Sequence, residues 1–431
     1  MSDTLRIAGG SVLHPDFSVT DGDVLVDREA GEILAVGDVE AGDERLDAEG
    51  CLVMPGLVNA HCHAAMTLLR GYADDKPLGD WLQEDIWPAE AELGAEDVRA
   101  GTELALVELI RSGTTAFADM YFHVPEVADA VERAGVRARV GHGVVTVGKD
   151  EEAAVDDNEE SLEVAREFDG DADGRIRTAY MPHSLTTVGE EYLREFVFQA
   201  REAGVPVHFH ANETTDEVAP IVDERGVRPL EYAADVGLLE DGDFLAHGVH
   251  TDDTEIDLLA DSDASVVHCP ASNMKLASGM APVQAMREAG VTVALGTDGA
   301  ASNNDLDLFD ELRDAAMLGK LQTGAADAVP AEAAVEMATA GGADALGFDS
   351  GRIEAGANAD LAVVDFSAPH LTPVHDHVSH LAYAATGQDV RHTVCDGEVL
   401  MRDREVLPFD EAAVRERAQQ RAAAVADRAG D

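Results

Sequence analysis

The chain has 431 residues, of which 45% are hydrophobic, so it can form one large domain with a smaller one, or two to three ordinary domains. Its formal net charge is −56, and the acidic residues are spread along the whole chain instead of forming a tail. The sequence lacks the basic stripe that neutralises phosphates, which disfavours nucleic-acid binding, so we expect no nucleic-acid partner. Lysine is rare while arginine is common, a composition typical of salt-accumulating cytoplasms, where molar salt screens the repulsion between carboxylates.

The sequence lacks the signals of a membrane span, of secretion and of a disulfide framework. No apolar stretch approaches the roughly 20 residues of a membrane-spanning helix. The start "MSDTLRIAGG" lacks the basic and apolar regions of a secretory signal. The four cysteines form no CxxC pair, which argues against a disulfide framework or a cysteine zinc site. We therefore expect a cytoplasmic protein without membrane contact.

Eight apolar or β-branched runs recur along the chain, and helix-period stretches separate most of them. The helical stretches include 96–113, 190–204 and 280–290, and several end in glycine, the usual helix stop. Eight strands that alternate with helices predict an α/β fold of the (β/α)8 barrel type. The eight runs cover residues 52–60, 113–120, 136–145, 176–184, 205–213, 243–250, 264–272 and 291–300.

Polar residues stand at the carboxyl end of each predicted strand. In a barrel these ends open on one face, where the catalytic groups of such enzymes lie. A single histidine of this kind is most often a satisfied core or loop residue, whereas a polar residue at the end of every run indicates a site. These residues are His61, His63, Asp119, His142, His183, His210, His247, His268 and Asp298.

The motif "HCH" supplies two candidate metal ligands. On a strand, residues i and i+2 point to the same side, so His61 and His63 face the barrel mouth together. His210 offers a third nitrogen and Asp298 an oxygen, which gives the mixed ligand set of hydrolytic zinc sites. Glu213, three residues past His210, can reach the cavity and transfer a proton, although alone it would be a solvated or helix-capping glutamate.

Five segments carry a resemblance to a known family: "PGLVNAHCHAAMTLLRG", "HFHANET", "LAHGVH", "HCPASNMKLASG" and "GTDGAASNNDLDLF". They resemble the amidohydrolase superfamily, especially its branch of 5-methylthioadenosine/S-adenosylhomocysteine deaminases and chlorohydrolase-like relatives. The likeness extends from about residue 5 to about residue 405, with the motifs in the family's order. It implies a (β/α)8 barrel at 57–352 and a small β-sandwich domain built from 1–56 and 353–431, the second part ending in a helix.

The resemblance also implies the chemistry. The four candidate ligands would hold one divalent metal ion per subunit, taken as zinc, while the ligand types alone leave iron, cobalt and manganese open. One ion is expected because the fourth predicted strand ends in "AYMPHS", without the carboxylated lysine that bridges two ions in some relatives. Hydroxide would attack C6 of an adenine ring while Glu213 protonates N1 and ammonia leaves. His247 would orient the water, and Asp298 would accept its proton.

The implied substrate is a 5′-substituted adenosine, such as 5′-methylthioadenosine, S-adenosylhomocysteine, 5′-deoxyadenosine or adenosine, and the products are the inosine analogue and ammonia. His183 resembles the family's substrate-contacting histidine, and Glu90 resembles the glutamate that binds the ribose hydroxyls. At position 142 relatives carry an arginine for the homocysteine carboxylate, whereas His142 is a weaker carboxylate partner. We therefore predict a preference for neutral 5′-substituents, with Arg139 or Lys149 as candidates to replace the lost contact.

Two alternatives stay open. The same barrel and metal could act on another heterocycle, such as guanine, cytosine or a triazine, although Glu90 and His183 favour a nucleoside. A catalytically silent barrel with a binding or assembly role is the other alternative, against which the complete ligand set argues. Related enzymes imply a homo-oligomer, either a dimer or a tetramer.

Several other features are given no catalytic role. Asp119 could brace the site or cap a helix, and His268, with Ser272 and Asn273, is expected to shape the pocket wall. The glycine-rich segment 341–351 does not open a helix after a strand, so it is predicted to be a loop and not a phosphate site. The segment 411–430 is predicted to be a packed or solvated helix.

Overall fold

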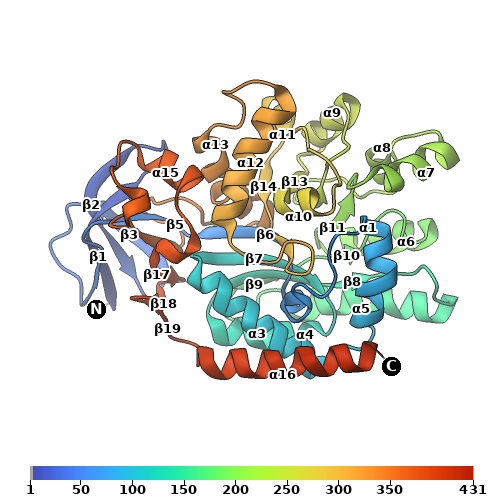
Figure 1. The fold of residues 1–431 in the computed structure, drawn as a ribbon, viewed down its shortest axis with the longest axis horizontal. Helices are drawn as coiled ribbons and strands as arrows, with labels where there is room; N and C mark the ends of the chain where they lie inside the picture. Colours follow the sequence, from blue (N-terminus) through green and yellow to red (C-terminus); the bar gives the residue numbers. More distant parts are fainter. Residues whose placement is uncertain (1–2, 431) are drawn as a thin grey trace.

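The computed structural model describes residues 3–430 and shows a mixed α/β fold (Figure 1). A six-stranded parallel sheet has the order β10-β8-β7-β6-β15, with β9 also paired to β8, and a four-stranded parallel sheet has the order β11-β12-β13-β14. The first sheet contains β6 (Leu57–His63), β7 (Thr114–Tyr121), β8 (Arg137–Val144), β9 (Ile176–Thr178), β10 (Met181–Pro182) and β15 (Asp298–Gly299). The second contains β11 (His208–Ala211), β12 (Phe244–His247), β13 (Ser265–His268) and β14 (Val293–Leu295).

The two parallel sheets are linked to each other by strand bridges at one end and by the chain itself at the other. Isolated bridges join Tyr180 to Val207 and Ser184 to His210. At the other end β15 follows β14 along the chain and pairs with β6, where Asp298 lies opposite Cys62. Each of the eight predicted runs overlaps one or two of these strands, which confirms the α/β prediction. Because all the strands are parallel, their carboxyl ends lie on one side of the molecule.

Amphipathic helices connect these strands. In α4 the residues Val127, Val131 and Ala134 are buried, and the helix ends at Gly135 with a φ of 82°, a conformation that glycine adopts without strain. The helices are α3 (Ala95–Arg111), α4 (Val124–Ala134), α5 (Glu151–Glu167), α6 (Glu190–Glu202), α7 (Thr215–Arg225), α8 (Pro229–Asp235), α9 (Asp253–Ser262), α10 (Pro270–Lys275), α11 (Val283–Glu288), α12 (Leu308–Thr323), α13 (Ala331–Met337) and α14 (Ala340–Leu346).

The prediction of a loop at 341–351 is wrong for its first half, which is helix α14. Here the glycines permit close packing: a Cβ on Gly341 would lie 2.7 Å from the carbonyl oxygen of Val293, and one on Gly342 would lie 2.7 Å from the Cβ of Val58. The helix therefore packs directly on β14 and β6. With the strands it encloses an apolar interior of Val58, Ala60, Ala116, Ala118, Met120, Ala179, Met181, Phe244, Val267, Cys269, Ala294, Ala343, Ala345, Leu346 and Phe348.

Both ends of the chain contribute to a separate nine-stranded sheet, seen in Figure 1 as blue and red strands side by side. Its order is β19-β18-β17-β16-β5-β1-β2-β3, with β4 paired to β1, so the hydrogen bonds form one continuous sheet. It has its own apolar core, which includes Leu5, Val24, Ile33, Val53 and Leu361. The strands are β1 (Thr4–Leu13), β2 (Val19–Asp27), β3 (Glu32–Gly37), β4 (Glu44–Asp47), β5 (Cys51–Pro55), β16 (Leu361–Asp365), β17 (Val390–Cys395), β18 (Glu398–Arg402) and β19 (Glu405–Val406).

Several short helical segments complete the fold. A 3-10 helix (Ala64–Leu69) follows β6, and α1 (Leu78–Trp81), a π-helical turn (Leu82–Ile86) and α2 (Trp87–Glu90) form one helical segment above the strand ends. The helix α15 (His377–Tyr383) lies between β16 and β17, and short 3-10 helices span Pro369–Leu371 and Gly387–Asp389.

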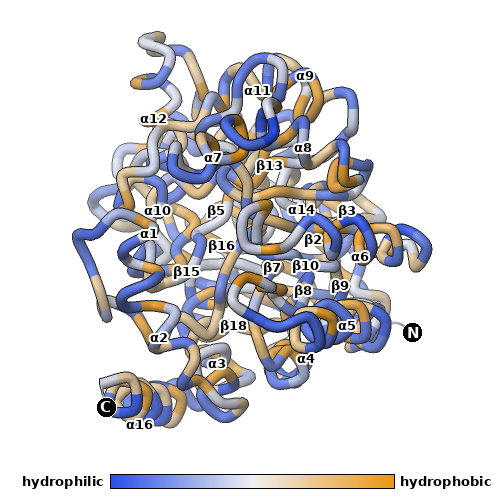
Figure 2. The backbone as a smooth tube through the Cα atoms, turned by 90° about the vertical axis from the view of Figure 1, so that its right-hand side faces the viewer, coloured by the Kyte–Doolittle hydropathy of each residue, from blue (hydrophilic) through white to orange (hydrophobic). Residues whose placement is uncertain are grey.

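The C-terminal helix α16 (Glu411–Ala429) lies along α3 at the edge of the molecule, and Figure 2 shows hydrophilic and hydrophobic residues interspersed along it. Its Arg417 forms an ion pair with the buried Glu103, and Arg428 pairs with Asp97. This confirms the predicted terminal helix and shows that it is packed. Within residues 3–430, no helix combines the length and the apolar character required to cross a membrane.

Candidate metal centre and active site

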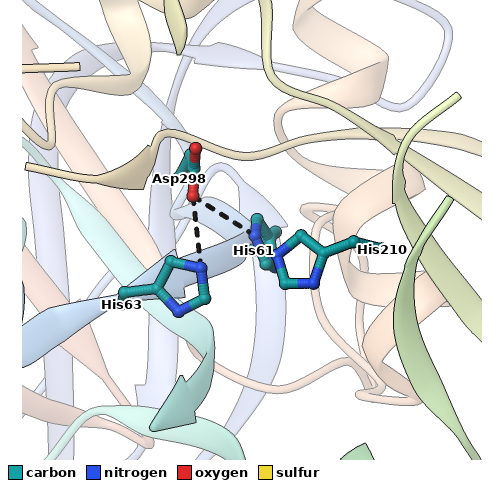
Figure 3. A group of neighbouring side chains, drawn as sticks. All are labelled: His61, His63, His210 and Asp298. Atoms are coloured by element: carbon teal, nitrogen blue, oxygen red, sulfur yellow. Dashed lines mark ion pairs between the residues drawn. The ribbon is translucent and has the colours of Figure 1, made fainter. Parts of the chain in front are cut away.

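Four predicted residues converge at the carboxyl ends of the strands, as Figure 3 shows: His61, His63, His210 and Asp298. Each offers one ligand atom, and these atoms all lie within 4.8 Å of one another. The strands β6, β11 and β15 position them, and the alternation of β6 places His61 and His63 on the same side. His61 is fully buried and the other three are at most 9% exposed.

Hydrogen bonds fix which ring nitrogen of each histidine is free. His63 Nδ1 lies 2.7 Å from the Met120 carbonyl oxygen, and His210 Nδ1 lies 2.7 Å from the His183 carbonyl oxygen. A carbonyl can only accept, so both Nδ1 atoms donate, and each imidazole in its neutral form has its lone pair on Nε2. His61 Nε2 is buried and has no hydrogen-bond partner within residues 3–430. Burial lowers the pKa of His61 to about 4 and holds the pKa of His210 well below its usual range.

One carboxylate oxygen of Asp298 faces the histidines, and the other accepts hydrogen bonds from two serines. Its Oδ2 accepts hydrogen bonds from the hydroxyls of Ser272 at 2.6 Å and Ser302 at 2.7 Å. Its Oδ1 lies 3.4 Å from His61 Nε2 and 3.3 Å from His63 Nε2. Burial opposes ionisation of this carboxyl, but the adjacent His61 and His63 keep its pKa well below the usual range. Three lone-pair nitrogens and one carboxylate oxygen fit a divalent cation.

Glu213 and His247 lie beside this group. Glu213 follows β11 and is 7% exposed; its Oε1 accepts a hydrogen bond from Ser278 at 3.3 Å, and its Oε2 lies 3.7 Å from His247 Nε2. Burial raises the pKa of Glu213, which favours the protonated form of this carboxyl. His247 ends β12 with a φ of 78°, and its Nδ1 donates to the side-chain oxygen of Asn273 at 2.9 Å, which leaves its Nε2 to face Glu213.

The structure also brings His183 and Glu90 close to the ligand group. The His183 ring centroid lies 4.7 Å from that of His210, and burial, followed by the charge of His63, lowers the pKa of His183 to about 4. Glu90 ends α2, in the helical segment above the strands. Burial raises the pKa of Glu90, which the nearby Tyr121 hydroxyl and the charge of His63 oppose. Its Oε1 is buried without a hydrogen-bond partner in the described part of the chain, so it can accept one from a ligand.

The structure does not bring His142 to this group. Its Nε2 lies 3.0 Å from Asp157 and its Nδ1 lies 3.6 Å from Glu160, both on α5, so the ring is directed toward the helix. Lys149 pairs with Asp157 at 2.7 Å. The Arg139 guanidinium lies above the Phe244 ring, close to Gly347 after α14, and Phe244 begins β12. Arg139 is therefore at the opposite ends of the strands from the site.

Asp119 and His268, which were given no catalytic role, lie near the site without joining the ligand group. Asp119 Oδ1 accepts a hydrogen bond from the backbone of Ala64 at 2.7 Å, which fixes the turn directly after His63. Burial raises the pKa of Asp119 to about 6. His268 is 2% exposed at the end of β13.

Sequence reasoning missed several supporting residues. His208 precedes His210 by two residues and lies against His61, and this i, i+2 spacing is the signal that could have identified it. Ser302 was not considered, and Ser272 and Asn273 were assigned to the pocket wall; the structure shows that these three bond to Asp298 and His247. No local pattern marks which of many serines and asparagines will make such contacts.

The parallel strands and the His61, His63, His210 and Asp298 group define the class of protein, and comparison with known sequences agrees. The sequence model of the amidohydrolase family matches residues 52–400, so the chain belongs to the amidohydrolase family. This confirms the resemblance found in the motifs.

Particular relatives match along most or all of the chain. The "5-methylthioadenosine/S-adenosylhomocysteine deaminase" of Halobacterium salinarum is 84% identical over 431 residues, covering 100% of both chains. The "5'-deoxyadenosine deaminase" of Methanosarcina acetivorans is 47% identical over 94% of both chains. A crystal structure of an adenosine deaminase from Xanthomonas campestris with bound zinc has a TM-score of 0.92, with 38% identity over 98% of both chains.

Proposed function

We propose that this protein is a metal-dependent hydrolytic deaminase that converts 5′-substituted adenosines to inosine analogues and ammonia. The observation that carries the proposal is the convergence of a complete nitrogen and oxygen ligand set with a buried carboxyl, Glu213, and an oriented imidazole, His247. The names of the relatives at 84% and 47% identity support a nucleoside substrate over guanine, cytosine or a triazine.

His61, His63, His210 and Asp298 would hold one divalent ion, for which zinc is our choice because the adenosine deaminase at 38% identity contains it. Such an ion lowers the pKa of a water and so makes a nucleophile available near neutral pH. The three imidazoles would bind the ion as neutral ligands through Nε2, because each Nδ1 donates elsewhere.

The remaining steps belong to side chains of this chain. Glu213 in its protonated form donates to N1 of the adenine ring, which makes C6 more electrophilic. Asp298 Oδ1 accepts a proton from the attacking water, since Oδ2 is held by two serine hydroxyls. His247 accepts a hydrogen bond from the same water through Nε2, because Asn273 holds the proton on Nδ1. The proton accepted by Asp298 would then pass to the amino group at C6, and the C6–N bond would break to release ammonia. Glu213 would recover its proton from the C6 hydroxyl, which leaves the 6-oxo product.

Glu90 would accept hydrogen bonds from the ribose hydroxyls, and His183 would contact the purine. The contact between His142 and the 5′-substituent stays a prediction. The carboxylates of Asp157 and Glu160 beside His142 would repel a carboxylate on the substrate. This supports the predicted preference for neutral substituents over S-adenosylhomocysteine.

Ammonia release from a panel of substrates tests the function. We expect turnover of 5′-methylthioadenosine, 5′-deoxyadenosine and adenosine, with a lower kcat/KM for S-adenosylhomocysteine and none for guanine, cytosine or triazines. Turnover confined to a free base or a triazine would refute the proposed substrate class. A higher kcat/KM for S-adenosylhomocysteine would refute only the preference for neutral substituents.

We further propose that residues 57–352 form a (β/α)8 barrel and that residues 1–56 and 353–431 form a small β-sandwich domain, although residues 1, 2 and 431 lie outside the described residues. The change of sheet at Gly56, between β5 and β6, and the separate apolar cores support this division. A cytoplasmic homo-oligomer, dimer or tetramer, completes the proposal, and light scattering on the purified protein tests the oligomeric state.

A further inference from the structure

His208 is a buried histidine that the proposed reaction does not use. It lies on β11 two residues before His210, is fully buried, and its ring stacks on Phe244 with centroids 4.0 Å apart. Its Nδ1 lies 2.9 Å from the Phe244 carbonyl oxygen, and its Nε2 lies 2.8 Å from His61 Nδ1. The three groups form a continuous chain of hydrogen bonds that ends at a candidate metal ligand.

The direction of these hydrogen bonds follows from the carbonyl. Because the Phe244 carbonyl can only accept, His208 Nδ1 carries a proton and, in a neutral ring, His208 Nε2 carries a lone pair. His61 Nδ1 must then donate to His208 Nε2, and the lone pair of His61 is left on Nε2, facing Asp298 Oδ1 at 3.4 Å. The opposite arrangement would place a buried positive charge on His208, which forms no ion pair within residues 3–430.

His61 differs in this respect from the other two candidate ligands. His63 and His210 donate to backbone carbonyls, which no substitution removes, whereas His61 donates to a side chain. The orientation and the free nitrogen of His61 therefore depend on the identity of residue 208.

We propose that His208 is a positioning residue that holds His61 in the tautomer and orientation required to bind the divalent ion. The inference rests on the proposed metal site and deepens it. Partners of this kind change metal affinity by about 10- to 100-fold when they are removed. The alternative is that His208 has a purely structural role, through its stacking on Phe244.

Two substitutions separate the roles. His208→Phe keeps an aromatic ring on Phe244 but removes the acceptor, while His208→Gln places an amide oxygen near the position of Nε2. Zinc affinity, measured by competition with a chelator in the absence of substrate, should fall about 10- to 100-fold in H208F and recover most of this loss in H208Q. The absorption spectrum of the cobalt-loaded H208F protein should also change, because a reoriented ligand alters the geometry around the ion.

His392→Phe is the matched control. His392 is also buried in a sheet and makes two hydrogen bonds, with the Asp47 carbonyl oxygen and the Asp403 amide, but it lies in the nine-stranded sheet. H392F should keep the parental zinc affinity. If H208F folds with the parental zinc affinity and cobalt spectrum, the proposal is overturned.

Neutron diffraction from the metal-free parent protein shows directly which nitrogen of His61 carries the proton, so this test does not depend on the folding of H208F. We expect hydrogen on His61 Nδ1, and hydrogen on Nε2 instead would overturn the assignment. Failure of the parent protein to bind any divalent ion would count against the proposed function and not against the tautomer, so the two failures can be distinguished.

Discussion

Glu213→Gln should abolish most activity while leaving the site intact. Gln retains an oxygen for the Ser278 hydroxyl, which donates to Oε1 at 3.3 Å, and its amide nitrogen would face the His247 Nε2 lone pair, now 3.7 Å from Oε2. Volume and contacts are thus preserved, and only the transferable proton is lost. General acid–base catalysis contributes about 10²- to 10⁴-fold, so we expect kcat to fall by that factor. The corresponding increase in the activation free energy is about 3–5 kcal/mol.

The assay follows the change in ultraviolet absorbance when 5′-methylthioadenosine is deaminated, with elemental analysis of the same preparation. The metal content and the free energy of unfolding of E213Q should match those of the parent. Glu311→Gln is the control, because Glu311 is fully buried and burial raises its pKa as well, but it bonds to Ala271 and Asn303 outside the ligand group. A metal-loaded E213Q protein with kcat within about tenfold of the parent would refute the assigned role.

Four further predictions concern the metal, its carboxylate ligand, the contact between β8 and the nine-stranded sheet, and the pH dependence of stability. Dialysis against a chelator should remove activity, and one equivalent of zinc per chain should restore it, as measured by titration. Ser302→Ala removes one of the two hydroxyls on Asp298 Oδ2 and should weaken zinc binding by about tenfold in chelator competition. Asp360→Asn removes the carboxylate charge 2.7 Å from the buried Arg137, which keeps Asp396 at 2.8 Å, and should lower the free energy of unfolding by about 1.5–3 kcal/mol in a denaturant titration, with unchanged activity if the pair is purely structural. Burial raises the pKa of Glu217 from 4.5 to about 8, so between these pH values the folded state holds a proton that the unfolded state has lost, and folding stability falls as the pH rises. The stability of Glu217→Gln relative to the parent should therefore increase as the pH rises through this window. An equal difference in stability below and above the window would contradict the assignment.

The parallel strands and their polar ends could be predicted because both depend on local periodicity. Runs of apolar residues identified the strands, and the alternation of a strand fixed that His61 and His63 share a side. Parallel strands bring their carboxyl ends together, so His210 and Asp298 could be expected nearby even though they lie far apart in the sequence. Glu213 followed from its distance to His210 along the chain. These inferences needed no knowledge of individual contacts.

Other features depend on the three-dimensional packing and could not be predicted. Glycines at 341–342 suggest a loop in the sequence, but in the structure they allow α14 to approach β6 and β14 within contact distance. The direction of the His142 ring toward α5, the hydroxyls on Asp298 and the contact between His208 and His61 are all set by which distant segments meet. The protonated nitrogen of each histidine is likewise decided by its partner.

The interior between the parallel strands is apolar at one end and polar at the other. Near α14 the space is filled by apolar side chains such as Val58 and Leu346, which contribute stability directly. At the carboxyl ends, buried lone pairs of three imidazoles and a carboxylate face one another within 4.8 Å, and His247 and Asp298 have left-handed φ values of 78° and 60°. Removing such groups from water and holding this backbone both cost free energy of folding. A divalent ion that binds only the folded chain offsets this cost, so occupancy of the site and stability of the fold are coupled.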